Sequence, residues 1–164
     1  VREPSDSAAS AAEILERLGG RWALIGALAA LRYRSNPRMT TDADLLADDV
    51  PGLADAFRDS GYDVDVHAEP GEPPHLLVVR GRGDQIDILL PVVEYQNTVL
   101  DRARDHVITV EDVILHKLIA WRPRDRNDIA SILATQPILD EGYIESWAAQ
   151  WEVSDRWRQA RELT

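Results

Sequence analysis

The pattern of apolar and polar positions predicts a chain that begins as alternating helices and strands and ends as helices alone. Short apolar or alternating segments, which are typical of strands, cover residues 21–26, 40–47, 62–68, 75–81 and 84–91. Longer segments, with helical spacing or rich in alanine and leucine, cover residues 5–20, 27–35, 51–61, 110–121, 123–135, 141–151 and 154–164. We therefore expect a mixed β-sheet with helices around it, followed by a helical region.

Residues that stop helices or form turns set the limits of these elements. The first helix has Ser or Asp available as its N-cap and ends at Gly19–Gly20. The helix before Pro37 ends there, because proline disfavours a helical residue in front of it. Residues 81–84, GRGD, predict a hairpin. The expected fold class is α/β (α+β), with residues 1–105 as the core and residues 106–164 as a helical region packed on it in a single compact unit.

Composition and charge exclude several classes of protein. The chain has 164 residues, of which 45% are apolar, enough for a globular protein with a real core. Its net charge of −11 argues against broad, non-specific nucleic-acid binding, which needs a basic surface. It has no cysteine, which excludes disulfides, thiolate metal sites and cysteine nucleophiles. No segment approaches the roughly 18 apolar residues of a membrane span. Val1 to Ser10 show no signal-peptide pattern, so we expect a cytoplasmic protein that does not contact a membrane.

Two aspartates one residue apart, Asp42 and Asp44, stand in the predicted strand 40–47. Alternate side chains of a strand point to the same face, so both carboxylates would project to one side and repel each other. Ala43 and Leu45 would then face the core. Such a pair of carboxylates is either left in water or neutralised by a cation.

A third carboxylate, Asp87, stands between Ile86 and Ile88 in a later predicted strand. Its burial without a partner would be costly. Three carboxylates on two neighbouring strands would suit Mg²⁺, which prefers oxygen ligands and commonly has substrate phosphates in its shell. A pair of such ions stabilises the attacking and leaving oxygens of phosphoryl-type transfer. In the alternative interpretation, Asp42 and Asp44 are surface residues and Asp87 pairs with an arginine.

The segment ALIGALAALRYRSNPRMTTDADLLA, residues 23–47, resembles the first motif of the nucleotidyltransferase superfamily that includes DNA polymerase beta. The resemblance is to the branch of minimal nucleotidyltransferases and AbiEii-type abortive-infection toxins. That branch reads Gly-Gly or Gly-Ser, a helix, and then Pro-Arg-x-Thr-x-Asp-x-Asp. The matching residues are Gly26, Pro37, Arg38, Thr40, Asp42 and Asp44. Ala27 replaces the second glycine or serine, which removes a hydroxyl that could help hold a triphosphate, although backbone N–H groups at a helix N-terminus can still do so.

A second segment, EDVILHKLIAWRPRDRNDIASIL, is similar to a later motif of the same branch, Glu-Asp-x-x-x-x-Lys-Leu-x-Ala-x-Arg-x-Lys-Asp-x-x-Asp. The matching residues are Glu111, Lys117, Ala120, Arg122, Asp125 and Asp128, with Arg124 where the family frequently has lysine. The apolar strand with Asp87 lies between the two motifs, where the family often has an aspartate. The chain is short for the toxin branch, so a partner could supply parts that read the substrate.

The charged residues of the second motif have both functional and structural interpretations. Lys117 lies off the apolar stripe of its helix, so it is either solvated or, as the resemblance implies, bound to nucleotide phosphates. Asp125 and Asp128 share a helical face. They could hold Arg122 or Lys117 in position, or one could accept the proton of the attacking hydroxyl. We assign catalysis to Asp125 and support to Asp128, which could equally pair with Arg124.

The resemblance implies a nucleotidyltransferase fold and a Mg²⁺-dependent transfer of a nucleotide from a nucleoside triphosphate to a hydroxyl of tRNA or protein. The setting would be a toxin of a prokaryotic toxin–antitoxin system, with its antitoxin protein as a partner. Asp42, Asp44 and Asp87 would bind metal, and Asp42, Asp44, Lys117 and Asp125 would be catalytic. The nucleotide would be bound by Gly26, Ala27, Arg38, Thr40, Arg122, Arg124 and Asp128.

Two other functions fit the same residues. One is an antitoxin of this fold that adenylylates a partner protein. The other is a catalytically silent binding module that uses Trp147, Trp151 and Trp157 as an interface, although these tryptophans would otherwise pack the last helices. Metal binding separates the silent module from the enzymes.

Overall fold

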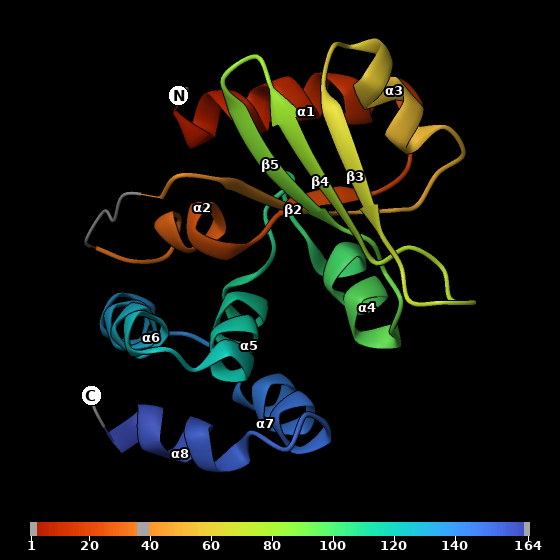
Figure 1. Ribbon diagram of the computed structural model, residues 1–164. Helices are drawn as coiled ribbons and strands as arrows, with labels where there is room; N and C mark the ends of the chain where they lie inside the picture. Colours follow the sequence, from red (N-terminus) through yellow and green to blue (C-terminus); the bar gives the residue numbers. More distant parts are fainter. Residues whose placement is uncertain (1–2, 36–39, 163–164) are drawn as a thin grey trace. The chain divides into compact units, whose positions relative to one another are not determined.

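The computed structural model describes residues 3–35 and 40–162 (Figure 1). The strands are β1 (Trp22–Leu24), β2 (Ala43–Ala47), β3 (Asp63–His67), β4 (Leu76–Gly81) and β5 (Asp84–Leu89). The helices are α1 (Pro4–Leu18), α2 (Gly26–Leu31), α3 (Leu53–Asp59), α4 (Glu94–Arg102), α5 (Val110–Ala120), α6 (Pro123–Thr135), α7 (Glu141–Gln150) and α8 (Ser154–Glu162). The predicted mixed α/β fold class, with helices alone at the C-terminal end, is confirmed.

The chain divides into two units, which we call the α/β unit and the helical unit. The α/β unit consists of Val1–Leu28 and Met39–Ile108, and the helical unit of Ala29–Arg38 and Thr109–Thr164. The α/β unit contains a five-stranded sheet in the order β1-β2-β5-β4-β3. Strands β2 and β5 are parallel, and the other neighbours are antiparallel. Helices α1 and α3 cover one face of this sheet, and α4 packs against β2 on the other (Figure 1).

The core of the α/β unit lies between α1, α3 and one face of the sheet. Alternate residues of the central strands supply it, among them Leu45 in β2 and Ile86 and Ile88 in β5, each fully buried. Full burial of such a side chain contributes about 1.5–3 kcal/mol. Because side chains alternate along a strand, this packing directs Asp44 and Asp87 to the opposite face.

A buried polar cluster anchors the start of β5. The hydroxyls of Ser7 and Tyr62 donate hydrogen bonds to the two oxygens of Asp84, at 2.9 and 2.6 Å. Burial, with the neighbouring Asp84, raises the pKa of Tyr62. The predicted hairpin is present, since Arg82 and Gly83 turn the chain with φ of 56° and 87°, as a two-residue connection requires. These contacts fix the register of the strand that carries Asp87.

In the helical unit, α5 packs against α6 and α7, and α8 packs against α6 and α7. The hydroxyl of Thr109 accepts a hydrogen bond from the backbone N–H of Asp112 and caps α5. Tyr143 donates from its hydroxyl to Asp112 at 2.6 Å, and the carboxylate of Glu111 accepts from the backbone N–H of Asp140 at 3.1 Å. Glu111 of the second motif therefore links α5 to α7. Of the C-terminal tryptophans, Trp157 is buried, Trp147 is half-buried and Trp151 is exposed.

Three details of the helices differ from the sequence-based expectations. Helix α4 was not predicted, although its buried Tyr95 and Val99 are four residues apart. Helix α2 ends at Leu31 rather than at residue 35, and the carbonyl of Tyr33 beyond it accepts hydrogen bonds from the side chains of Thr135 and Gln136. The N-cap of α1 is Glu3, with Pro4 as the first helical residue, and not Ser or Asp. The predicted stop at Gly19 is confirmed.

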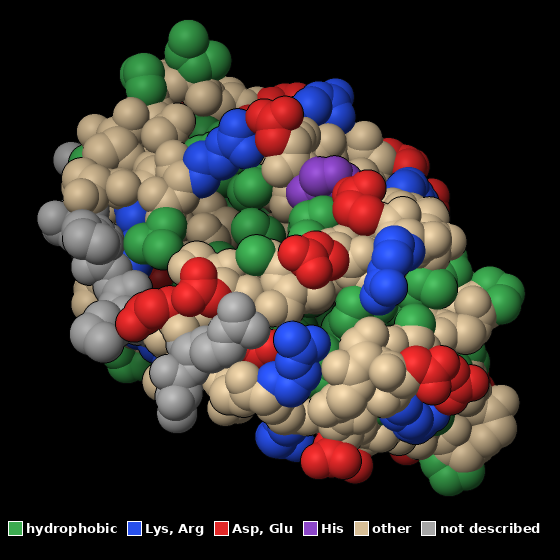
Figure 2. Space-filling model, turned by 90° about the horizontal axis from the view of Figure 1, so that it is seen from above, with side chains coloured by type: hydrophobic (Ala, Val, Ile, Leu, Met, Phe, Trp, Pro, Cys, Tyr) green, Lys and Arg blue, Asp and Glu red, His purple; other side chains and the backbone are tan. Residues whose placement is uncertain are grey.

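On the face shown in Figure 2, acidic and basic side chains are interspersed and form no large patch of one charge. This agrees with the sequence-based argument against broad nucleic-acid binding. Within the described ranges, none of the helices combines the length and the apolar character that crossing a bilayer requires.

Candidate functional site

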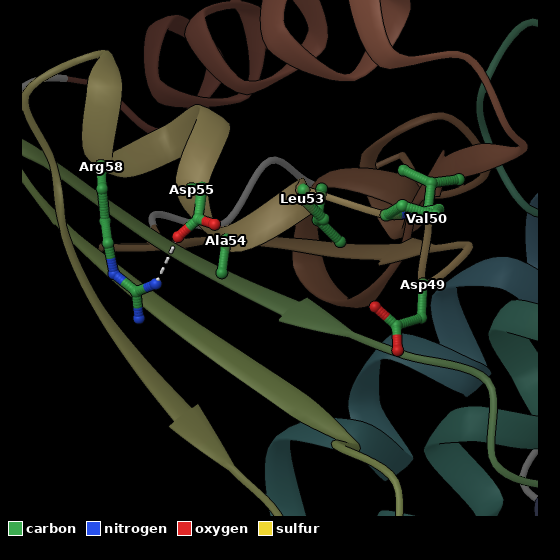
Figure 3. A pocket seen from close by; sticks show the side chains of 8 residues that line it. Asp49, Val50, Leu53, Ala54, Asp55 and Arg58 are labelled. Atoms are coloured by element: carbon green, nitrogen blue, oxygen red, sulfur yellow. Dashed lines mark hydrogen bonds and ion pairs between the residues drawn. The ribbon is translucent and has the colours of Figure 1, made fainter.

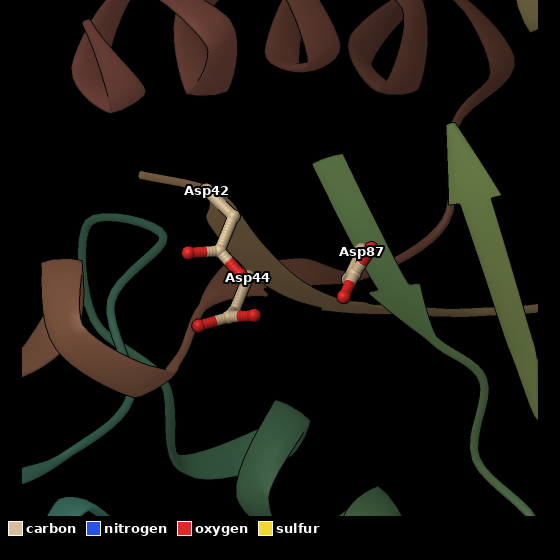
Figure 4. Close-up of side chains that lie close together, drawn as sticks. All are labelled: Asp42, Asp44 and Asp87. Atoms are coloured by element: carbon tan, nitrogen blue, oxygen red, sulfur yellow. The ribbon is translucent and has the colours of Figure 1, made fainter. Parts of the chain in front are cut away.

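Three carboxylates, those of Asp42, Asp44 and Asp87, converge on the face of the sheet opposite α1 (Figure 4). In the parallel pair β2–β5, Asp44 and Asp87 stand directly beside each other. Asp42 was predicted to lie within the strand but precedes β2 by one residue, and its side chain still lies on the same face. One oxygen of each carboxylate lies within 4.8 Å of the other two. The predicted convergence of the three residues is therefore present, and we call them the aspartate triad.

Asp87 is the least satisfied member of the triad. Its Oδ1 is buried and has no hydrogen-bond partner among the described residues. Burial, and then the negative charge of Asp42, raise the pKa of Asp87, against the opposing charges of Arg80 and His67. Within the described part of the chain, Asp87 forms no ion pair with an arginine, so the alternative interpretation of Asp87 finds no support. A buried, unpaired carboxylate oxygen among other oxygen donors fits a hard divalent cation.

The threonines before β2 hold Asp42. The hydroxyls of Thr40 and Thr41 donate hydrogen bonds to Oδ1 of Asp42, at 3.2 and 3.1 Å. Thr40, which was predicted to bind nucleotide, thus supports a carboxylate of the triad. The predicted nucleotide-binding residue Arg38 lies outside the described residues.

Gly26 lies directly against Asp44. Its φ is +60°, and a Cβ atom built on it would stand 2.3 Å from Oδ2 of Asp44. The backbone N–H of Ile25 donates to the carbonyl of Asp44 at 3.0 Å, which holds the two segments together. Only glycine combines this backbone conformation with so close an approach. Ala27, the departure from the family motif, is buried and is the second residue of α2.

Replacing Gly26 with Ala should therefore displace the Asp44 carboxylate. We expect a loss of about 1–2 kcal/mol in the free energy of unfolding from the left-handed backbone, and in addition a loss of any stabilisation by Mg²⁺. Gly71→Ala is the matched control, since Gly71 has φ +85° and open space around its Cβ position. Chemical unfolding of both variants with and without Mg²⁺ measures the difference. An unchanged Mg²⁺ response in Gly26→Ala would show that the contact does not position Asp44.

A second group of predicted residues forms a buried ion-pair cluster in the helical unit. The ammonium of Lys117 contacts Oδ2 of Asp128 at 2.6 Å and Oδ1 of Asp125 at 3.5 Å. Nη1 of Arg34 donates to Oδ1 of Asp128. The side chains of Lys117, Asp128 and Arg34 are only 7%, 4% and 4% exposed. The interpretation of Lys117 as a solvated lysine is therefore wrong.

Asp125 connects this cluster to the start of α6. It accepts hydrogen bonds from the backbone N–H and the Nε of Arg122, at 3.0 and 2.7 Å. Burial acts to raise the pKa of Asp125, but the hydrogen bonds from Arg122 and the charge of Lys117 outweigh it and lower the pKa. Arg124 is exposed. Arg34 lies in the first motif segment but at none of its matching positions. It is the member that sequence reasoning missed, because nothing in its neighbours' pattern marks it as buried.

A separate hollow of about 410 Å³ lies at the loop before α3 (Figure 3). Asp49, Asp55 and Arg58 are its charged lining residues, and Arg58 donates to Asp55 at 2.9 Å. None of the aspartate triad lines it. The triad, and not this hollow, is the candidate site.

Comparisons with known proteins do not assign the chain to a family. No protein-family model matches the chain, and no curated protein matches it. The chain is similar to the crystal structure of an antigenic nucleotidyltransferase-like protein from Paracoccidioides brasiliensis, with 15% identical residues and a TM-score of 0.48. The match covers 84% of this chain and 78% of that chain. At this level of likeness, an argument about function must come from the residues of the site.

Proposed function

We propose that this chain is a Mg²⁺-dependent nucleotidyltransferase that moves a nucleotide from a nucleoside triphosphate to a hydroxyl group and releases pyrophosphate. The observation that carries the proposal is the convergence of Asp42, Asp44 and Asp87, each with an oxygen within 4.8 Å of the others. The order and spacing of the two sequence motifs support the same activity. Three carboxylates this close together repel one another, and a bound cation would offset that repulsion.

The residues of the α/β unit have distinct roles in this proposal. Asp42, Asp44 and Asp87 would hold Mg²⁺, which when bound would polarise phosphoryl oxygens and offset their charge. Because Gly26 has no Cβ, it would leave the space that the Asp44 carboxylate occupies. Thr40 would fix Asp42 through its hydrogen bond.

The transfer forms a bond between the acceptor hydroxyl oxygen and the α-phosphorus, and it breaks the bond from that phosphorus to the oxygen of the leaving pyrophosphate. The hydroxyl proton needs an acceptor whose pKa is near the working pH. Asp125 is proposed as this acceptor, although the hydrogen bonds from Arg122 and the charge of Lys117 lower its pKa and make it a weak base. Phosphate binding by Lys117 stays part of the proposal, although its ammonium is engaged by Asp128.

The acceptor is proposed to be tRNA or a protein, in the setting of a prokaryotic toxin–antitoxin system, and this step rests on the resemblance of the motifs. Incubation of the protein with each labelled triphosphate, total tRNA and a cell extract identifies the nucleotide and the acceptor. Label on tRNA supports the toxin reaction, whereas label on a single protein fits a toxin with a protein acceptor as well as the adenylylating antitoxin, and the genomic neighbours then separate these two.

Metal binding gives the most direct test. Mg²⁺ should raise the melting temperature of the parent protein, because the folded state alone brings the three carboxylates together. At a Mg²⁺ concentration of ten times the Kd, the free energy of unfolding rises by about 1.4 kcal/mol, which corresponds to a rise of roughly 3–6 °C in melting temperature for a chain of this size. Asp87→Ala should remove most of the rise, as measured by differential scanning calorimetry.

The pH dependence of this shift provides a second check. Protonated Asp87 cannot bind the ion, and its pKa is raised in the metal-free folded protein. Without metal, the contribution of Asp87 to the free energy of unfolding therefore falls as pH rises through this raised pKa. The rise in melting temperature on adding Mg²⁺ should grow over the same range. If Mg²⁺ leaves the melting temperature unchanged at every pH, the silent binding module is the better explanation.

A further inference from the structure

Two polar side chains, Gln85 and Arg80, lie on the same sheet face as the aspartate triad. Gln85 stands two residues before Asp87 in β5, so it shares the face of that carboxylate. It is paired in register with Arg80 of the neighbouring strand β4. On the other side of β5, the parallel register with β2 places Asp42 at the level of Gln85. Asp42, Gln85 and Arg80 therefore form one row across three neighbouring strands.

The donors of Gln85 and Arg80 are available to a ligand. Both side chains are exposed, and neither donates a hydrogen bond to another described residue. Arg80 forms an ion pair with Asp65 at 3.5 Å, in which the two side chains are 55% and 76% exposed. Water screens such a pair, so it holds the guanidinium only weakly. The charge of Arg80 also extends to the triad, since it acts on the pKa of Asp87.

The row combines the groups that a phosphate needs beside a metal ion. Carboxylates can hold a phosphate only through a cation, whereas amide and guanidinium N–H groups donate to phosphate oxygens directly. Neighbouring strands lie about 4.8 Å apart, so Gln85 is one strand spacing from Asp42 and Arg80 is two. A phosphate beside the triad, or the next phosphate of the same substrate, would thus be within reach of both long side chains.

We propose that Arg80, with Gln85 between it and the triad, binds a phosphate oxyanion of the substrate held at Asp42, Asp44 and Asp87. The inference rests on the proposed function. The oxyanion belongs either to the triphosphate or to the phosphodiester backbone of a nucleic-acid acceptor, which offer the same chemistry. Arg80 is the determinant of affinity, because its planar fork makes two charge-assisted hydrogen bonds to a phosphate.

The test compares Arg80→Gln with Arg58→Gln as the matched control. Arg58 is also an exposed arginine of the α/β unit in an ion pair with an aspartate, but it belongs to α3, which covers the opposite face. Calorimetry measures the affinity for pyrophosphate and, separately, for a single-stranded RNA oligonucleotide, both with Mg²⁺. Arg80→Gln should weaken one of the two affinities by about 10- to 100-fold, the effect of a lost hydrogen bond to a charged group. Arg80→Lys should recover part of the loss.

The outcomes separate the sources and the two proposals. Weakened binding of pyrophosphate alone assigns Arg80 to the triphosphate, and weakened binding of the oligonucleotide alone assigns it to a nucleic-acid acceptor. Unchanged affinities for both, or equal losses in Arg58→Gln, overturn the role of Arg80 while the Mg²⁺ shift of the parent still supports the transferase. A parent that shows no Mg²⁺ shift and binds neither probe overturns both. The melting temperature of Arg80→Gln should stay at the parent value, since the exposed pair with Asp65 contributes little.

Discussion

Asp44→Asn is expected to abolish nucleotide transfer and to leave the fold intact. The substitution keeps the shape of the side chain and removes one of the charges that would hold Mg²⁺. Loss of a metal ligand that stabilises the transition state by several kcal/mol lowers the rate by about 1000-fold or more. Removal of one of three repelling carboxylates should leave the free energy of unfolding without metal unchanged or slightly raised. Single-turnover transfer assays and chemical unfolding without Mg²⁺ measure the two effects.

Asp59→Asn is the control for that experiment. Asp59 is an exposed carboxylate at the end of α3, which covers the opposite face of the sheet. Its replacement changes the net charge by the same amount without altering the triad. If Asp44→Asn unfolds easily while its folded fraction keeps full activity, Asp44 is a structural residue and the proposed function fails.

The aspartate triad could be predicted from the sequence because it depends on local periodicity. Asp42 and Asp44 share a face since they are two residues apart where the chain enters β2, and the buried Ile86 and Ile88 force Asp87 to the opposite face of its own strand. The pairing of β2 with β5 is a long-range contact that periodicity does not predict, and only the resemblance, in which an aspartate often stands in this apolar strand, pointed to it. The close approach of Gly26 to Asp44 requires a backbone φ in the left-handed region. In the sequence, the glycine itself is the one sign of this conformation.

The buried cluster around Asp128 could not be predicted in the same way. Lys117 looks solvated on a helical wheel, because it lies off the stripe of Leu115 and Leu118. Its burial depends on Arg34, far away in sequence, and on a carboxylate in the next helix. Ion pairs between distant segments leave no periodic signal, so the pattern of one helix cannot reveal whether a charged residue is exposed or buried with a partner.

The cluster leads to the second large expected effect, which is on stability. Asp128→Asn should lower the free energy of unfolding by about 3–5 kcal/mol, because it leaves two buried cations without their shared carboxylate. Lys117 would keep only the longer contact with Asp125, at 3.5 Å. Arg34 would lose its partner at Nη1, and its Nε and Nη2 already lack hydrogen-bond partners among the described residues. Urea unfolding monitored by tryptophan fluorescence measures the change.

Two further variants show whether the loss comes from unpaired buried charge. Lys117→Met should cost less than Asp128→Asn, because Asp128 keeps Arg34 and Asp125 keeps Arg122. Asp55→Asn, which breaks the exposed pair with Arg58, should cost at most about 1 kcal/mol. If Lys117 also binds nucleotide phosphates, Lys117→Met should lower the transfer rate by about 10- to 1000-fold, a larger effect than its loss of stability explains. Equal stability of Asp128→Asn and the parent would show that the cluster does not hold α5 and α6 together. The ammonium of Lys117 would then be available to bind nucleotide phosphates.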